Sequence, residues 1–297
     1  MTVLVTGATG KTGRRVVESL VSRGVGVRAM VRDIERGKMA TLGMAVELVL
    51  GDFDDPASIS EAADGCSSMF LVVRDNDEQV RQETEAARLA IEAGVSHIVK
   101  LSSSDAELRR SYWAVAHHDI ELAIAQMDVG YSFIRPNYFM EGFLALFKAD
   151  PNGDVTLEVP TGDGQIGAID TYDIGETAAT LLANGKPLNG HALITGTENI
   201  SMDRVAAAFS AVANQKITYV DADPESYRKV LEIQHSANAG DLADIYEEVR
   251  SGTAEMISND VERITGTPAR LIEQFAAANS DAIDAAISHA LNARNAT

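Results

Sequence analysis

Met1-Thr-Val-Leu-Val-Thr-Gly7-Ala-Thr-Gly10-Lys-Thr-Gly13 is the stretch that decides the fold of this chain. A short apolar run ends at Gly7, and two more glycines follow at Gly10 and Gly13. The residues after Gly13 carry apolar side chains at helical spacing. A strand, a glycine-rich turn and a helix in this order form a cradle for the pyrophosphate of a dinucleotide. Any tight turn before a helix also favours glycine, so the triplet indicates dinucleotide binding only together with its strand and helix.

Each part of this cradle has a separate physical task. Gly7 allows the chain to turn sharply off the strand, Gly10 allows the backbone to approach the phosphates, and Gly13 allows the helix to pack closely. The N-terminus of the helix supplies free N–H groups and the positive end of its dipole. We therefore expect the following loop residues to bind the cofactor: Gly7, Thr9, Gly10, Lys11, Thr12 and Gly13.

Composition excludes several classes of partner. The 297 residues carry a formal net charge of −19, which disfavours binding to nucleic acid and to anionic membrane surfaces. The single cysteine, Cys66, permits no intramolecular disulfide and is expected to be a small packing residue. No apolar run reaches about eighteen residues, so we expect a cytoplasmic protein that binds no membrane, and we expect no metal site.

The first half of the chain alternates strand-like and helix-like segments. The strands are expected at Val3–Val5, Val25–Val31, Val46–Leu50, Ser67–Val73, His97–Leu101, Tyr131–Arg135 and His191–Thr195. Helical patterns between them imply parallel βαβ units, and hence an α/β fold with a doubly wound parallel sheet of the Rossmann type. The rhythm changes after Pro136. We expect residues 1–138 to form a dinucleotide-binding domain, to which 166–196 return, and 139–297 to form mainly a smaller α+β domain on the substrate side.

The end of the second strand bears on the choice of cofactor. An acidic residue there favours NAD(H), because it binds the ribose 2′-hydroxyl, whereas an arginine accommodates the 2′-phosphate of NADP(H). Arg32 comes first off the strand, and its guanidinium suits a phosphate. Asp33 follows directly, so a shift of the strand end by one residue would reverse the conclusion. The sequence favours NADP(H) over NAD(H).

Other strand ends supply further candidates, because ligands of open α/β sheets bind at the carboxyl edge. Asp52 and Phe53 follow the third strand and are candidates for the adenine, although Asp52 could instead cap the next helix. Val73 and Arg74 end the fourth strand and are expected beside the ribose and pyrophosphate. Ser102 ends the fifth strand and is also a candidate for binding the cofactor, at a place where a substrate hydrogen bond is expected, although serines are also ordinary turn residues.

The acid/base candidates lie on the helix after the fifth strand. Tyr112 has Ala116 four residues later, so a lysine-assisted tyrosine is absent from this turn. His117 and Glu121 stand at i and i+4 on one helix face. A carboxylate beside an imidazole raises the imidazole pKa and orients it as a proton donor, so both are catalytic candidates. The alternative is an ion pair on a surface helix.

These residues together resemble the NmrA-like branch of the short-chain dehydrogenase/reductase superfamily. The resemblance is carried by Gly7-Ala-Thr-Gly10-Lys-Thr-Gly13, Val31-Arg32, Gly51-Asp52, His97-Ile-Val-Lys100-Leu-Ser-Ser, His117-x-x-x-Glu121, Phe133-Ile-Arg-Pro136-Asn-Tyr-Phe-Met140-Glu, Ile169-Asp170-x-x-Asp173-Ile174 and Thr267-Pro268. It implies a segment beside the nicotinamide that opens the substrate cleft. Pro136 would contact the cofactor there, and Asn137, Tyr138, Phe139 and Met140 would contact the substrate. Core packing is the alternative for these apolar side chains.

Two functions follow from the resemblance. The first is an NADPH-dependent reductase that transfers hydride to a small conjugated acceptor such as a quinone, a dye, an imine or an enal. The alternative is a redox sensor that binds NADP(H) without turnover and passes the redox state to a protein partner. A homodimer is compatible with both functions.

Overall fold

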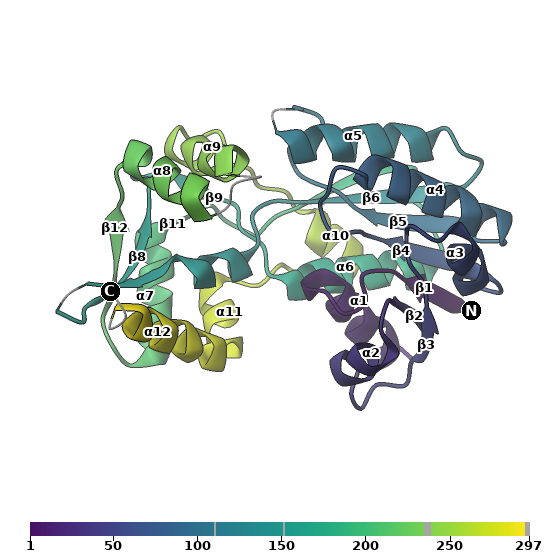
Figure 1. Ribbon diagram of the computed structural model, residues 1–297, viewed down its shortest axis with the longest axis horizontal. Coiled ribbons are helices and arrows are strands. Elements are labelled where there is room, and N and C mark those ends of the chain that lie inside the picture. The colour runs from purple at the N-terminus through teal and green to yellow at the C-terminus, as the bar shows by residue number, and fades with distance from the viewer. Residues whose placement is uncertain (110, 151, 235–238, 295–297) are drawn as a thin grey trace. The chain divides into compact units, whose positions relative to one another are not determined.

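The computed structural model describes residues 1–109, 111–150, 152–234 and 239–294. The chain divides into two compact units, and it crosses between them several times (Figure 1). Unit 1 consists of Met1–Pro136, Thr171–Ile194 and Asp260–Thr267. Unit 2 consists of Asn137–Asp170, Thr195–Asn259 and Pro268–Thr297.

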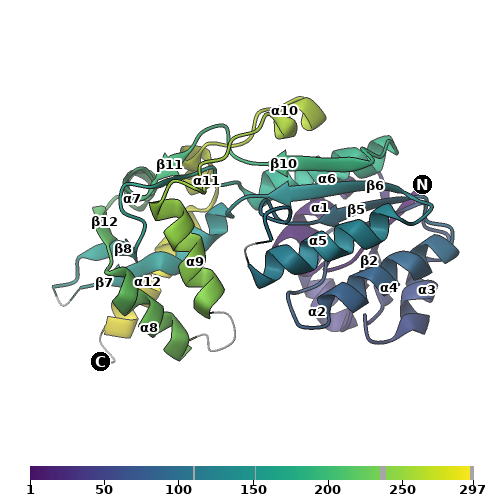
Figure 2. The same cartoon turned by 90° about the horizontal axis from the view of Figure 1, so that it is seen from above.

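Unit 1 is built on a seven-stranded sheet in the order β10-β6-β5-β4-β1-β2-β3, and every neighbouring pair is parallel. Figure 2 shows β10 alongside β6 at one edge of the sheet. The strands are β1 (Thr2–Val5), β2 (Gly26–Val31), β3 (Glu47–Leu50), β4 (Ser68–Leu71), β5 (His97–Leu101), β6 (Gly130–Pro136) and β10 (Gly190–Ile194). The predicted doubly wound parallel sheet is therefore confirmed.

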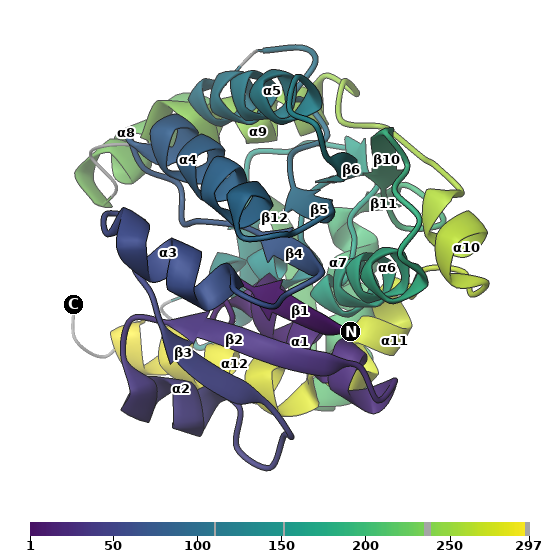
Figure 3. The ribbon, with the colours of Figure 1, turned by 90° about the vertical axis from the view of Figure 1, so that its right-hand side faces the viewer.

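Helices cover both faces of this sheet, which explains why its central strands are continuous apolar runs. Figure 3 shows α3, α4 and α5 on one face and α1, α2 and α6 on the other. Every residue of β4 and β5 is buried. The helices of unit 1 are α1 (Lys11–Ser22), α2 (Ile34–Ala40), α3 (Pro56–Ala63), α4 (Gln79–Glu92), α5 (Tyr112–Ala125), α6 (Thr171–Asn184) and α10 (Asp260–Thr265).

Unit 2 combines small sheets with helices. β8 (Val155–Val159) pairs with β7 (Phe147–Ala149) and β12 (Ile217–Asp221), and β9 (Gln165–Ile166) pairs with β11 (Ile200–Ser201). The helices are η1 (Met140–Leu146), α7 (Met202–Ala213), α8 (Pro224–Gln234), α9 (Ala239–Arg250), α11 (Ile272–Ala278) and α12 (Ser280–Arg294).

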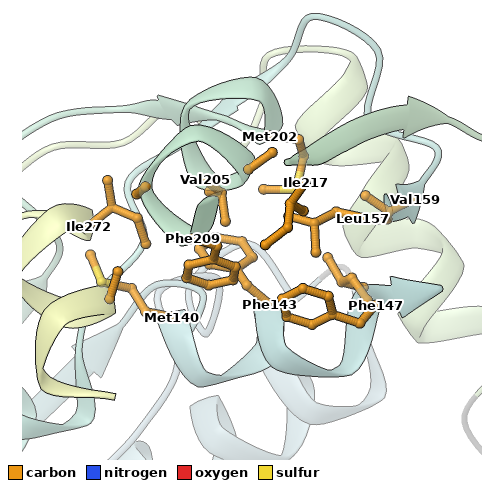
Figure 4. Packing of buried hydrophobic residues seen from close by; sticks show 14 of the residues in the cluster. Met140, Phe143, Phe147, Leu157, Val159, Met202, Val205, Phe209, Ile217 and Ile272 are labelled. Atoms are coloured by element: carbon orange, nitrogen blue, oxygen red, sulfur yellow. The ribbon is translucent and has the colours of Figure 1, made fainter. Parts of the chain in front are cut away.

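Unit 2 has its own hydrophobic core, in which η1, the three-stranded sheet, α7 and α11 meet (Figure 4). Phe147 and Phe209 stack there with ring centroids 5.7 Å apart. Such aromatic pairs add to the stabilisation that burial gives. Among the helices of the described residues, none is long and apolar enough to cross a bilayer.

Candidate functional site

The turn between β1 and α1 has the geometry that a phosphate cradle needs. Gly7 has a φ of +58°, a region that favours glycine, and its carbonyl accepts a hydrogen bond of 2.8 Å from the Gly10 N–H. A Cβ added at Gly13 would lie 2.2 Å from the Gly7 carbonyl oxygen, so only glycine allows this close packing. No side chain caps α1 at Gly10, so the N–H groups of its first turn can bind an anion.

A cavity of about 750 Å³ opens at the carboxyl ends of β1 to β4, beside this turn. It brings together every residue predicted to bind the cofactor except Ser102 and Pro136. The lining residues are Gly7, Thr9, Gly10, Lys11, Thr12, Gly13, Met30, Val31, Arg32, Gly51, Asp52, Phe53, Asp54, Val72, Val73, Arg74, Asp75, Asn76, Glu78 and Gln82. The cavity belongs wholly to unit 1. Its place matches the strand-end crevice in which open α/β sheets bind ligands.

The structure separates the roles of Arg32 and Asp33. β2 ends at Val31, and the exposed Arg32 side chain lines the cavity. Asp33 does not line it, because its Oδ1 accepts hydrogen bonds from the N–H groups of Glu35 at 2.8 Å and Arg36 at 3.1 Å. Asp33 is thus the N-cap of α2. Arg32 is the charged group that this strand end offers to a ligand.

Asp52 also lines the cavity and does not cap the next helix. Its Oδ1 accepts the Asp54 N–H at 3.0 Å, and the N-cap residue of α3 is Asp55. The alternative of a purely capping role for Asp52 is therefore excluded by the structure. Its carboxylate is a hydrogen-bond acceptor at the end of β3, where an adenine amino group could donate to it.

A polar wall of the cavity comes from residues that the sequence did not single out. The Gln82 amide donates to Asp54 Oδ1 at 3.0 Å, and the Asn76 amide donates to Gln82 Oε1 at 3.0 Å. Hydrogen bonds from Gln82 and Arg81 hold the pKa of the Asp54 carboxyl below its usual value. Asn76 follows the end of β4, as Val73 does, so its position after a strand could have identified it. Gln82 lies on α4, where no sequence feature marks it as a cavity residue.

Three buried polar side chains lie between β5 and the helices α4 and α5, and we call them the Lys100 network: Lys100, Glu83 and His117. Figures 1 and 2 show these two helices side by side. Lys100 Nζ lies 2.8 Å from His117 Nδ1 and 3.1 Å from Glu83 Oε2, and it donates to the Leu101 carbonyl at 2.6 Å. Glu83 Oε1 accepts the N–H of the cavity residue Val73 at 3.1 Å. The network therefore runs from the cavity wall to α5.

The expected pairing of His117 with Glu121 is wrong. Glu121 accepts Arg135 Nε–H at 3.0 Å and Arg135 Nη2–H at 2.6 Å, and the Ser102 hydroxyl donates to it at 2.5 Å. Burial and the nearby Lys100 ammonium lower the pKa of His117, whereas the sequence predicted a raised pKa. The alternative of a surface ion pair is wrong too, since both side chains are buried. Neither residue lines the cavity.

The side chains that follow β6, from Asn137 to Met140, make most of their contacts within unit 2. Met140 is only 2% exposed and belongs to the core in Figure 4, so its side chain packs inside unit 2 and is not available for the predicted contact with a substrate. Tyr138 stacks on Phe143 with centroids 5.1 Å apart. The Asn137 amide donates to the Ala254 carbonyl at 3.3 Å, and the backbone of Phe139 forms a bridge with Ile169. Asn137, Tyr138 and Phe139 remain partly exposed.

Comparison with known proteins shows which family the chain matches. The family model described as the NmrA-like family matches residues 1–283. A reductase of (4-alkanoyl-5-oxo-2,5-dihydrofuran-3-yl)methyl phosphate from Streptomyces griseus is 29% identical over 287 residues, which cover 94% of this chain and 98% of that protein. NAD(P)H azoreductase from Xenophilus azovorans is 26% identical over 291 residues, or 96% of this chain and 100% of that protein.

A solved structure shares the fold. The NADPH-dependent quinone oxidoreductase of Escherichia coli, determined in complex with NADPH, superimposes with a TM-score of 0.79 and 21% sequence identity. The match covers 94% of this chain and 99% of that chain. The two proteins thus share a fold over most of their lengths.

Proposed function

The chain belongs to the NmrA-like family, and from this premise we propose that it is an NADPH-dependent reductase which transfers hydride to a small conjugated acceptor. It is an NAD(P)H-dependent oxidoreductase, as its named relatives are. The preference for NADPH and the class of acceptor are the proposed parts. The acceptor class comprises quinones, azo and other dyes, imines and enals.

The observation that carries the proposal is the cavity of unit 1 with Arg32 on its wall and Asp33 turned to α2. The close packing at Gly13 and the uncapped start of α1 fit a pyrophosphate. Lys11 and Arg32 are the cavity residues whose charge and position suit the 2′-phosphate of NADP(H). Asp52 fits the adenine.

The acceptor class is inferred from chemistry. The bound NADPH supplies the hydride. A conjugated acceptor takes up hydride readily, so it demands less acid catalysis from the protein than an isolated carbonyl does. The chain has Ala116 where a tyrosine-assisting lysine would stand after Tyr112, and its relatives reduce an azo bond and an unsaturated lactone by name. These features favour an acceptor of this class.

The cofactor preference is tested by Arg32→Ala. A lost charge-assisted contact with the 2′-phosphate is expected to weaken NADPH binding by about 1.5–3 kcal/mol, which is roughly 10- to 150-fold in Kd, and to leave NADH binding nearly unchanged. Arg36→Ala is the matched control, because Arg36 is exposed, lies nearby and does not line the cavity. Equal losses for NADPH and NADH in Arg32→Ala would refute the role of Arg32.

Turnover is tested by mixing the protein with NADPH and a panel of quinones, azo dyes, imines and enals, while the cofactor absorbance is followed. Oxidation with at least one acceptor is expected. Tight NADPH binding without oxidation by any acceptor would favour the redox sensor instead. Failure to bind either dinucleotide would refute both functions.

A further inference from the structure

Lys100 is a buried cation that does not line the cavity proposed to bind the dinucleotide. Its side chain and that of Glu83 are both 0% exposed. An ammonium has three N–H donors and no acceptor. Nζ hydrogen-bonds the Leu101 carbonyl and His117 Nδ1, and it forms an ion pair with Glu83 Oε2 at 3.1 Å. Its charge and its donors are therefore used within unit 1.

This arrangement decides where His117 carries its proton. Because the ammonium can only donate, His117 Nδ1 must accept, and the ring proton must then be on Nε2. The neighbouring positive charge opposes a second ring proton. His117 is thus a neutral imidazole with an N–H at Nε2.

The Nε2–H of His117 has no protein partner among the residues that the structure describes. The side chain is only 9% exposed, yet Nε2 is not one of the fully buried side-chain atoms that lack a partner in the described part of the chain, so this N–H is accessible to a small molecule. The Lys100 network places His117 at the end of β5, at the carboxyl edge where open α/β sheets bind ligands, and connects it to the cavity residue Val73. Glu121, one turn later on α5, cannot accept this N–H because Arg135 and Ser102 occupy its oxygens.

We propose that Lys100 is a positioning residue, which fixes His117 as the neutral Nε2–H tautomer so that this N–H donates a hydrogen bond to the hydride acceptor. The inference rests on the proposed reductase function. Hydride adds to the acceptor, the electron pair of the reduced π bond moves to its oxygen or nitrogen, and solvent supplies the proton. His117 keeps its own proton and stabilises the developing negative charge through the hydrogen bond.

The tautomer is tested first by NMR on protein labelled with ¹⁵N at its six histidines, with His117→Gln used to assign the signals. The wild type at neutral pH is expected to show a bare, pyridine-type Nδ1 and a protonated, pyrrole-type Nε2. An Nδ1–H tautomer or an imidazolium in the wild type would overturn the proposal without any variant. This readout does not depend on activity, so it is distinct from a failure of the reductase function.

A double variant then isolates Lys100. Lys100→Met/Glu83→Gln removes the donor without leaving an unpaired buried charge, so His117 is expected to populate both tautomers. Unchanged His117 signals in the double variant would refute the role of Lys100.

The kinetic comparison is between the wild type, the double variant and His117→Phe, with NADPH and an acceptor that the wild type reduces. His117→Phe removes the donor and is expected to lower kcat about 100-fold, the scale on which loss of one preorganised donor acts. The double variant is expected to lower kcat only in proportion to the Nε2–H fraction that its NMR signals show, about twofold for equal tautomer populations. Its NADPH Kd should stay within about twofold of the wild type, because the amide oxygen that Glu83→Gln introduces can still accept the Val73 N–H. A wild-type kcat in His117→Phe would refute the donor role of His117.

Discussion

His97 gives the most quantitative prediction, because it makes the stability of unit 1 depend on pH. The ring lies on β5 and is 3% exposed. Its Nε2 is 3.0 Å from Ser132 Oγ, and its Nδ1 is buried without a hydrogen-bond partner. Burial lowers the pKa of His97 from 6.5 to about 4. Protonation would place a charge and an unpaired N–H inside the protein.

The sign follows from proton linkage. Between pH 6.5 and about 4 the unfolded state binds a proton at His97 and the folded state does not. The free energy of unfolding therefore falls as the pH falls through this window. The full shift corresponds to about 3 kcal/mol, of which about 2 kcal/mol is lost between roughly pH 7 and pH 5.

The assay is urea denaturation of the wild type and His97→Gln at pH 7 and pH 5. Glutamine keeps a polar group near Ser132 but does not titrate, so the variant is expected to lose about 2 kcal/mol less between the two pH values than the wild type. His191→Gln is the matched control, because His191 is an exposed histidine on β10 of the same sheet. Equal pH dependence in the wild type and His97→Gln would refute the reasoning.

Three further perturbations test packing and charge. Lys100→Met is expected to lower the free energy of unfolding by about 3–5 kcal/mol, since Glu83 stays buried without its cation; adding Glu83→Gln should restore most of it, and no restoration would contradict the ion pair. Gly13→Ala brings a Cβ against backbone and is expected to abolish dinucleotide binding, measured by fluorescence titration, whereas Gly190→Ala, whose Cβ would meet only the Leu188 carbonyl oxygen at an ordinary 3.9 Å, should bind normally. Met140→Ala is expected to cost about 2–5 kcal/mol in urea denaturation; a loss below about 1 kcal/mol would argue against its core position.

The fold of unit 1 could be predicted because its strands leave a clear pattern. A strand buried on both faces is rich in apolar residues, and the run Met69-Phe-Leu71 in β4 is of this kind, between helical patterns. The return of Asp260–Thr265 to unit 1 as α10 could not be predicted. Val261 is its only buried side chain in the described structure, so a six-residue helix of this kind carries no periodic signal.

Most residues that line the cavity of unit 1 could be predicted from the sequence, but the choice between the neighbours Arg32 and Asp33 could not. Sequence places Arg32 and Asp33 at one strand end but does not say which of them faces the cavity. The structure decides this through a local need of α2, whose first N–H groups require an acceptor. Asp33 supplies it, and a shift of one residue in the helix start would have reversed the roles. Cap geometry therefore decides which of these two charged side chains lines the cavity.

The prediction that His117 pairs with Glu121 was wrong because helical spacing shows which residues share a face, but not which residues they contact. His117 and Glu121 do share a face of α5, yet each has its closest charged partner on a neighbouring strand, Lys100 on β5 and Arg135 on β6. In a tyrosine–lysine pair the helix itself supplies the assisting cation, so sequence spacing reveals it. Here a strand supplies the cation, and it acts on a histidine by holding the ring neutral. A lysine inside an otherwise apolar strand, as in His97-Ile-Val-Lys100-Leu101, is the signal that could have found it, because a buried ammonium requires acceptors from the covering helices.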